Sequence, residues 1–324
     1  MQPTFPLLRL PENAIVQVLQ NMNPNQLLII SLVSTKSKNL VTSLGLRASD
    51  VYIYISREIS LPVAVGGYIF ALKFYDDSNI QNELLSVDTA LPVDALLLFV
   101  NKTIQSSTPF NFSDWLDHIK SVFCYAKPPN IKFYRGCERF EIQSLKEAIG
   151  NVDFLHVSSE VTDVYTKEVL KHFNASNEVS LERNPFEKSC EIQTLFIQNF
   201  KMIVFEDVYS LDDMLLVNSE KVRLYRPTSQ KQFNQFLKHW IRGSNLRLQY
   251  MLLLIYNPNS VSREVLLKGI HFVDVAEEEQ LEICRKHNIV SDYMVQIIRK
   301  DGTPAVIAIN KREAILDVRF IVLY

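Results

Sequence analysis

Glycine and cysteine are both scarce in this chain. Only 8 of the 324 residues are glycine, which argues against glycine-rich cofactor loops and against flexible linkers between domains. The 4 cysteines lie far apart and suit reduced thiols better than a disulfide framework. They are Cys124, Cys137, Cys190 and Cys284. We therefore expect the protein to work in a reducing compartment, the cytosol or the nucleus.

Strong charge and long apolar runs are missing as well. The formal net charge is −2, which provides no general electrostatic attraction for nucleic acid or for an anionic membrane. The longest apolar runs, residues 95–100 and 250–256, are far shorter than the ~18 residues that a membrane span needs. Residues 1–4 contain neither a basic region nor an apolar core, so we expect no signal peptide.

The sequence contains none of the common catalytic or cofactor-binding motifs. Gly-x-Ser-x-Gly, Gly-x-x-x-x-Gly-Lys, His-Glu-x-x-His and Cys-x-x-Cys are all absent. His118, Cys124 and Cys137 come nearest to a ligand cluster, but their spacing fits no common zinc site. The acidic pairs at 76–77 and 212–213 are typical of a turn and of a helix start. The sequence therefore predicts a protein that is not an enzyme and has no catalytic, cofactor-binding or metal-binding residues.

Three short helices are predicted before residue 47. Leu10-Pro11 is a helix entry, because proline is tolerated at the first helical position. Asn23-Pro24 repeats this start signal with an asparagine N-cap, and Ser34 caps a third helix. Apolar residues recur along the first helix at helical spacing: Ile15, Val18, Leu19 and Met22.

The second of these helices is apolar nearly all round through residues 27–33. Such a helix must be buried on all sides, and a unit of roughly 45 residues cannot do this alone. Its second wall must come from the rest of the chain or from a partner. The Leu-Pro and Asn-Pro starts, followed by Ser-Leu-Val-Ser at 31–34, resemble the F-box. That resemblance implies a surface for a Skp-family adaptor that includes Leu10, Pro11, Ile15, Leu19, Leu27, Leu28 and Val33.

After residue 47 the pattern changes first to strands and then to alternating strands and helices. Strands are predicted over residues 50–55, 59–65, 68–75, 95–100, 131–134, 152–157, 293–299, 305–309 and 314–323. Helices are predicted over residues 115–123, 142–149, 164–173, 211–217, 232–241 and from residue 277. Gly66-Gly67 and Asp301-Gly302 are hairpin signals, so antiparallel pairing is expected near both ends of this region.

A regular spacing links three apolar patches that contain Leu195, Leu224 and Leu253. Both steps, from 195 to 224 and from 224 to 253, are 29 residues long. Strand-plus-helix units with a period in the twenties are typical of leucine-rich repeats, although the asparagine ladder of standard repeats is missing here. If these leucines are core residues of strands, their neighbours should project from the sheet: Phe196, Arg223, Tyr225 and Leu252. Among them Arg223 and Tyr225 are the preferred candidates for contact with a target, because both residue types are common interface anchors.

The most distinctive stretch is the segment 236–248. Its Phe-Leu-Lys-His-Trp-Ile sequence is the end of an amphipathic helix that Gly243 stops, with Lys238, His239 and Arg242 near the negative end of the helix dipole. Together with the flanking segments 212–215 and 267–270, it resembles the nematode F-box-associated domain of the second type. The resemblance extends over about residues 180–275.

The two resemblances together imply the substrate-recognition adaptor of an SCF-type (Skp–cullin–F-box) ubiquitin ligase. Residues 1–50 would be the F-box, which binds a Skp-family adaptor and, through it, a cullin–RING core. Residues 51–111 would be a small, mainly antiparallel β region. Residues 112–324 would be an irregular, leucine-rich-repeat-like α/β domain that holds an unknown target protein.

Two alternatives remain open at this point. The chain can be a leucine-rich-repeat-like interaction scaffold whose N-terminal helices only cap the array. It can also be an enzyme that works from a cleft, in which case convergent polar groups with shifted pKa values should line a pocket.

Overall fold

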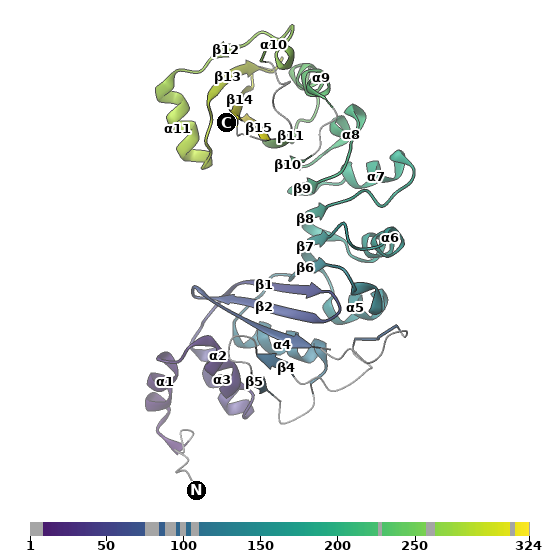
Figure 1. The fold of residues 1–324 in the computed structure, drawn as a ribbon. Helices are drawn as coiled ribbons and strands as arrows, with labels where there is room; N and C mark the ends of the chain where they lie inside the picture. The colour runs from purple at the N-terminus through teal and green to yellow at the C-terminus, as the bar shows by residue number, and fades with distance from the viewer. Residues whose placement is uncertain are drawn as a thin grey trace. The chain divides into compact units, whose positions relative to one another are not determined.

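The computed structural model describes residues 9–74, 84–87, 95–97, 102–104, 110–225, 229–256, 263–311 and 315–323. The chain divides into two compact units, Met1–Ser176 (unit 1) and Asn177–Tyr324 (unit 2). Unit 1 begins with helices and continues into a sheet, and both units are mixed α/β (Figure 1). The expected helical start and α/β class are therefore confirmed.

Unit 1 opens with the three predicted helices. They are α1 (Glu12–Gln20), α2 (Pro24–Ser31) and α3 (Thr35–Ser43). Asn23 and Gln26 form a capping box at the start of α2, in which each side chain accepts the other residue's backbone N–H at 3.0 Å. Ser34 caps α3 by accepting the Ser37 N–H at 3.1 Å. Local capping signals in the sequence thus place both helix starts.

The sheet of unit 1 combines an antiparallel and a parallel part. Its strands are β1 (Ala48–Ile55), β2 (Ile59–Val65), β3 (Tyr68–Phe74), β4 (Ala95–Leu97), β5 (Lys102–Ile104), β6 (Asn130–Phe133) and β7 (Val152–Val157). Neighbouring strands follow the order β7-β6-β1-β2-β3-β4-β5. The pairs from β1 to β5 are antiparallel, whereas β1, β6 and β7 run parallel.

The helices that follow β5 in unit 1 cover one face of this sheet and bury its core. They are α4 (Phe112–Val122), the short 3₁₀ turn η2 (Cys137–Arg139), α5 (Ile142–Ile149) and α6 (Asp163–His172). Alternate residues of β1 and β2 are buried, as the period-two pattern predicts. Trp115 of α4 lies against Phe74 of β3, with ring centres 6.2 Å apart, and Phe123 lies 5.4 Å from Phe70.

Parallel strands in chain order form the first half of the sheet in unit 2. The strands of this half are β8 (Ala175–Leu181), which crosses the unit boundary, β9 (Met202–Phe205), β10 (Lys221–Leu224) and β11 (Tyr250–Tyr256). The second half is antiparallel and consists of β12 (Val273–Asp274), β13 (Tyr293–Ile298), β14 (Pro304–Lys311) and β15 (Ile315–Val322). β15 pairs with β11, so the order is β8-β9-β10-β11-β15-β14-β13-β12.

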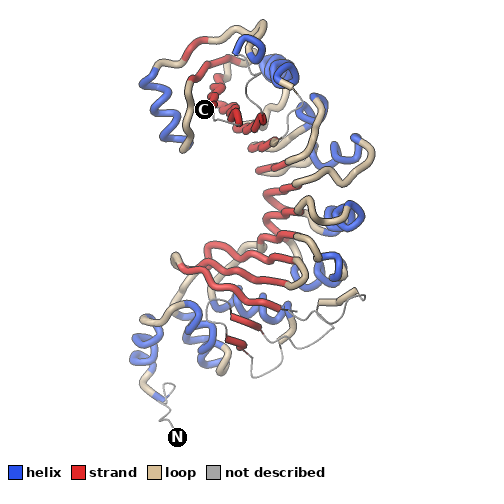
Figure 2. The backbone as a smooth tube through the Cα atoms, viewed as in Figure 1, coloured by secondary structure: helices blue, strands red, loops and turns tan. Residues whose placement is uncertain are grey.

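Helices lie on both faces of the unit 2 sheet, but over different strands. The helices are α7 (Ser189–Phe196), α8 (Leu211–Leu216), α9 (Gln230–Ile241), α10 (Arg263–Leu266) and α11 (Glu277–His287). Helices α7, α8 and α9 connect the parallel strands and lie on one side of them (Figure 2). Helix α11 packs on the opposite face, where Ile283 joins a separate core with Met294, Val306 and Ile321.

One expectation about unit 2 is wrong. Leu195 lies in helix α7, not in a strand, and the register places Phe205 of β9 opposite Leu224. The buried residues Ile192, Leu195 and Phe196 stand at helical spacing, so they form the apolar side of a helix. The 29-residue step therefore holds between the strand residues Leu224 and Leu253, which face each other in register, but not before them.

The other predicted elements lie close to their expected positions. Six elements were not predicted from the sequence: β5, α7, β8, β9, α10 and β12. Among the predicted segments, residues 75, 98–100 and 314 fall outside the described residues, as does the first acidic pair at 76–77.

Candidate functional site

The nearest candidate for a ligand cluster is not assembled. Across the described ranges, no three His, Cys, Asp or Glu side chains are grouped so that they could hold a metal ion. Cys124 is exposed, while Cys137 is buried and its burial raises the pKa of the thiol. His118 is buried beside Ser31.

None of the helices in the described parts of the chain is long and apolar enough to cross a membrane.

Other elements of unit 1 cover the apolar helix α2 of the N-terminal helices. Helix α2 packs against α3, α4 and β3. Four residues of the expected adaptor surface are buried in this interior: Ile15, Leu19, Leu27 and Leu28. Their side chains are covered by the packing of unit 1 itself. The apolar pattern identifies the face that must be covered, but it does not say what covers it.

The remaining residues of that set lie at or near the surface. Val33, at the end of α2, is 59% exposed. Pro11 is exposed and Leu10 is half-buried at the start of α1, and Val18 of the same helix is also exposed. We call Leu10, Pro11, Val18 and Val33 the α1–α2 surface. The packing of unit 1 does not bury any of these four apolar residues.

A buried hydrogen bond fixes α2 to α4 beneath this surface. The Ser31 Oγ lies 2.7 Å from Nε2 of His118 and donates to the Leu28 carbonyl at 2.7 Å. Because a serine hydroxyl has one hydrogen, Ser31 accepts the N–H of His118, and this assigns the proton to Nε2. Burial, together with the nearby Lys38, lowers the pKa of His118 to about 4. The imidazole is therefore neutral at pH 7.

The distinctive stretch of unit 2 is helix α9 and the turn after it. Ser229 caps the helix by accepting the Gln232 N–H at 3.2 Å, and Gly243 ends it with a φ of 111°. The buried face of the helix consists of Gln232, Phe233, Asn234, Phe236, Leu237 and Trp240. The Trp240 ring lies edge-on to Phe320 of β15, with 4.8 Å between ring centres. The helix thus packs on β15 of the antiparallel half of the sheet through its aromatic face.

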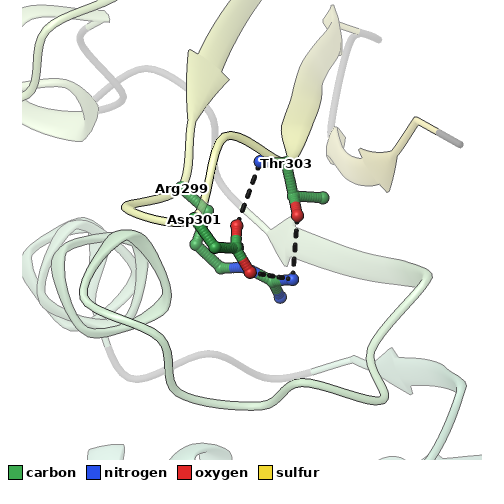
Figure 3. A network of polar contacts seen from close by, with 3 residues as sticks. All are labelled: Arg299, Asp301 and Thr303. Carbon is green, nitrogen blue, oxygen red and sulfur yellow. Dashed lines mark hydrogen bonds and ion pairs between the residues drawn. The ribbon is translucent and has the colours of Figure 1, made fainter.

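The hairpin between β13 and β14 holds the end of this helix. The Lys300 N–H donates to the Ile241 carbonyl at 2.8 Å, and the Arg299 guanidinium lies 5.2 Å from the centre of the Trp240 ring. Arg299 also donates to Asp301, with Nε 3.0 and 2.9 Å from the two carboxylate oxygens, and to the Thr303 hydroxyl at 3.0 Å (Figure 3). These bonds lower the pKa of Asp301.

The polar residues of the motif also have structural partners. Asn245, with a left-handed φ of 52°, donates from Nδ2 to the carbonyls of Met214, Leu215 and Val217 at 3.1, 3.2 and 2.9 Å. It thereby satisfies the carbonyls at the end of α8. Asp213 completes a capping box with Ser210 at the other end of α8. Asn245 thus binds the end of α8, and Trp240 packs α9 on the sheet. These contacts give the residues of segment 236–248 a structural role in the fold.

The open face of the parallel strands presents different side chains. Val222 and Leu224 of β10 are buried under the helices, whereas Lys221 and Arg223 are exposed on the opposite face. This agrees with the expected alternation around Leu224 and Leu253. Tyr225 follows β10 and is half-buried. Phe196 does not project from a strand as expected: it is buried in α7 with its ring 5.4 Å from that of Phe205.

A cleft of about 530 Å³ lies where this open face meets the end of α11. We call it the basic cleft, because Lys221 and Arg223 of β10 and Lys286 and His287 of α11 line it, together with Met202 and Tyr250. Of the two target-contact candidates, Arg223 lines this cleft and Tyr225 does not. Lys286 and His287 were not among the expected site residues, because the sequence explains them as basic residues that complement a helix dipole.

The fold defines a class of protein in which three short helices precede mixed α/β structure along the chain. Comparisons with known proteins give both parts a family. Residues 7–49 match the F-box domain, and residues 191–253 match the family described as F-box associated. The chain therefore carries an F-box domain and an F-box associated domain, as the sequence motifs indicated.

One known relative aligns with nearly all of the chain. The F-box associated domain-containing protein sdz-33 of Caenorhabditis elegans is 24% identical over 304 residues, which cover 93% of this chain and 92% of the relative. No solved structure matches the chain.

Proposed function

We propose that the protein is the substrate-recognition adaptor of an SCF-type ubiquitin ligase. The observation that carries the proposal is the pairing of an F-box domain with an F-box associated domain in one chain. F-box domains generally bind a Skp adaptor within such ligases. An adaptor accelerates ubiquitin transfer by holding a target lysine near the charged conjugating enzyme, so that the effective concentration rises without a catalytic residue of its own.

We assign one role to each of three consecutive segments of the chain. Residues 1–50 bind the Skp adaptor, residues 51–111 form a β region behind them, and residues 112–324 hold the target on leucine-rich-repeat-like stacked α/β units. The adaptor contact is assigned to the α1–α2 surface, with Val33 and Pro11 as the exposed members. The buried residues Ile15, Leu19, Leu27 and Leu28 support that surface from below.

Val33 offers the sharpest test of the adaptor contact. A glutamate in place of Val33 puts a charge into an apolar interface, where an unpaired buried charge is costly, and should weaken Skp binding by at least about tenfold. Val164→Glu is the matched control, because Val164 is 76% exposed on α6 of the same unit. Binding of each full-length variant to a purified Skp adaptor is measured by titration calorimetry. Equal affinities for the two variants would remove the α1–α2 surface from the proposal.

One observation favours a second candidate function. Helix α2 packs on α4 and β3, which is the packing expected if the N-terminal helices only cap an interaction scaffold. A scaffold of this kind would bind its target through unit 2 but would not bind a Skp adaptor at all. The wild-type chain in the same titration therefore separates the two functions.

A further inference from the structure

Basic side chains from two elements that are distant in sequence meet at the basic cleft. Lys221 and Arg223 come from β10, and Lys286 comes from the last turn of α11. Among the residues that the structure describes, none of these three has a carboxylate within ion-pair distance. Other cations of unit 2 are paired: Arg299 with Asp301 at 2.8 Å and Arg319 with Asp317 at 3.3 Å.

The pKa values of two rings in the cleft are shifted by burial first and by the nearby cations second. Burial, and then Lys286 and Lys221, lower the pKa of His287. Burial raises the pKa of Tyr250, while Arg319 and Arg223 act in the opposite direction. Cations from β10 and from α11 therefore act on groups in the same small space. Bringing like charges together costs free energy, and an anion between them would relieve the repulsion.

Packing holds the two walls of the cleft in place. Ile283 of α11 lies in a core with Met294, Val306 and Ile321, and the half-buried Tyr250 packs against the same core. Lys286 and His287 follow Ile283 by three and four residues, so they lie on the same side of the helix, toward the sheet. Lys221 and Arg223 are fixed by the pairing of β10 with β9 and β11. The backbone positions from which these cations reach the cleft are therefore fixed by packing.

We propose that the basic cleft binds an acidic peptide segment of the target protein. The proposal rests on the proposed function and adds the chemical class of the target. Charge complementarity selects a carboxylate-rich ligand, and Met202 and the Tyr250 ring offer apolar surface for the side-chain stems of a peptide. A cleft of about 530 Å³ accommodates a few residues. Three cations line this cleft in a chain of net charge −2, which favours a local peptide contact over the long basic track that a nucleic acid needs.

The test uses the full chain and a short fluorescent peptide of alternating Glu and Gly. Fluorescence anisotropy measures its affinity, with the Gln–Gly peptide as the uncharged probe. Arg223→Gln and Lys286→Gln should each weaken binding of the acidic peptide about three- to fivefold, and the double variant by about tenfold or more. Arg285→Gln is the matched control, because it removes the same charge from the neighbouring residue of α11 and does not line the cleft.

Each outcome decides the proposal. Selective weakening by the two cleft variants, with Arg285→Gln close to wild type, supports it. Equal binding of the acidic and uncharged peptides, equal effects of all three substitutions, or binding of a single-stranded oligonucleotide or anionic vesicles without the peptide overturns it. Titration of the same variants with a Skp adaptor reports the proposed function separately. Intact adaptor binding with no peptide binding would refute the cleft assignment alone.

Discussion

Acid should destabilise unit 1 through one histidine, which lies where helix α4 packs against the F-box helix α2. His118 of α4 is buried, and its pKa is lowered to about 4 from the ordinary value of 6.5 by burial and by Lys38 of α3. Since the folded-state pKa is depressed, the folded protein disfavours the protonated imidazole. The stabilising contribution is fully present above pH 6.5 and is lost as the pH falls toward 4.

The size of this pH-dependent stabilisation follows from the lowered pKa of His118. A change of 2.5 pKa units, from 6.5 to about 4, corresponds to about 3 kcal/mol of unfolding free energy across the whole window, and to about 2 kcal/mol at pH 5. His118→Gln removes the titration and keeps a donor for Ser31. The difference in unfolding free energy between wild type and variant should therefore shrink or reverse by about 2 kcal/mol between pH 7.5 and pH 5.

Urea denaturation at the two pH values measures this difference. The two tryptophans lie in different units, Trp115 in α4 and Trp240 in α9, so a Trp240→Phe background makes Trp115 fluorescence a reporter of unit 1. Comparison with the variant cancels the carboxylates that titrate in both proteins. A difference that stays constant between pH 7.5 and pH 5 would show that His118 is not held neutral by burial, and the reasoning would fail.

Three further substitutions test the packing of the two units, each by urea denaturation of the full chain. Trp240→Ala should destabilise unit 2 by about 3–5 kcal/mol, because it leaves a cavity beside Phe320; a loss below about 1 kcal/mol would contradict the packing. Asn245→Ala should cost about 1–3 kcal/mol by leaving carbonyls at the end of α8 without their donor, and a neutral result would exclude this role. Gly136→Ala should cost about 1–3 kcal/mol, because φ is 88° and the added Cβ would lie 2.6 Å from Cγ of Arg57; unchanged stability would rule out the close contact.

Local signals account for the parts of the fold that the sequence predicts well. The caps at Asn23 and Ser34 and the turn at Asp301-Gly302 are set by residues within one turn of the chain, so they can be recognised without the tertiary structure. The alternation in β10 likewise follows from strand geometry. Leu195 was misassigned because a short apolar run fits both a strand and a buried helix, and only its packing against the sheet decides between them.

The candidate surfaces depend on contacts that the sequence does not encode locally. Arg223 was predicted as a projecting residue, but its partners Lys286 and His287 belong to a helix that follows only after β11 and β12. Nothing in the intervening sequence indicates that α11 packs on the open face of the sheet. In the same way, the burial of Leu27 and Leu28 depends on α4, which begins at Phe112. Long-range packing therefore decides which predicted residues form a surface.

Hydrogen exchange of the full chain with and without a purified Skp adaptor tests the central claim most directly. If the protein is an SCF substrate adaptor, a complex forms and protection increases within residues 10–33, around the α1–α2 surface, while the peptides of unit 2 are unchanged. Absence of a complex, or protection confined to unit 2, would contradict the assignment.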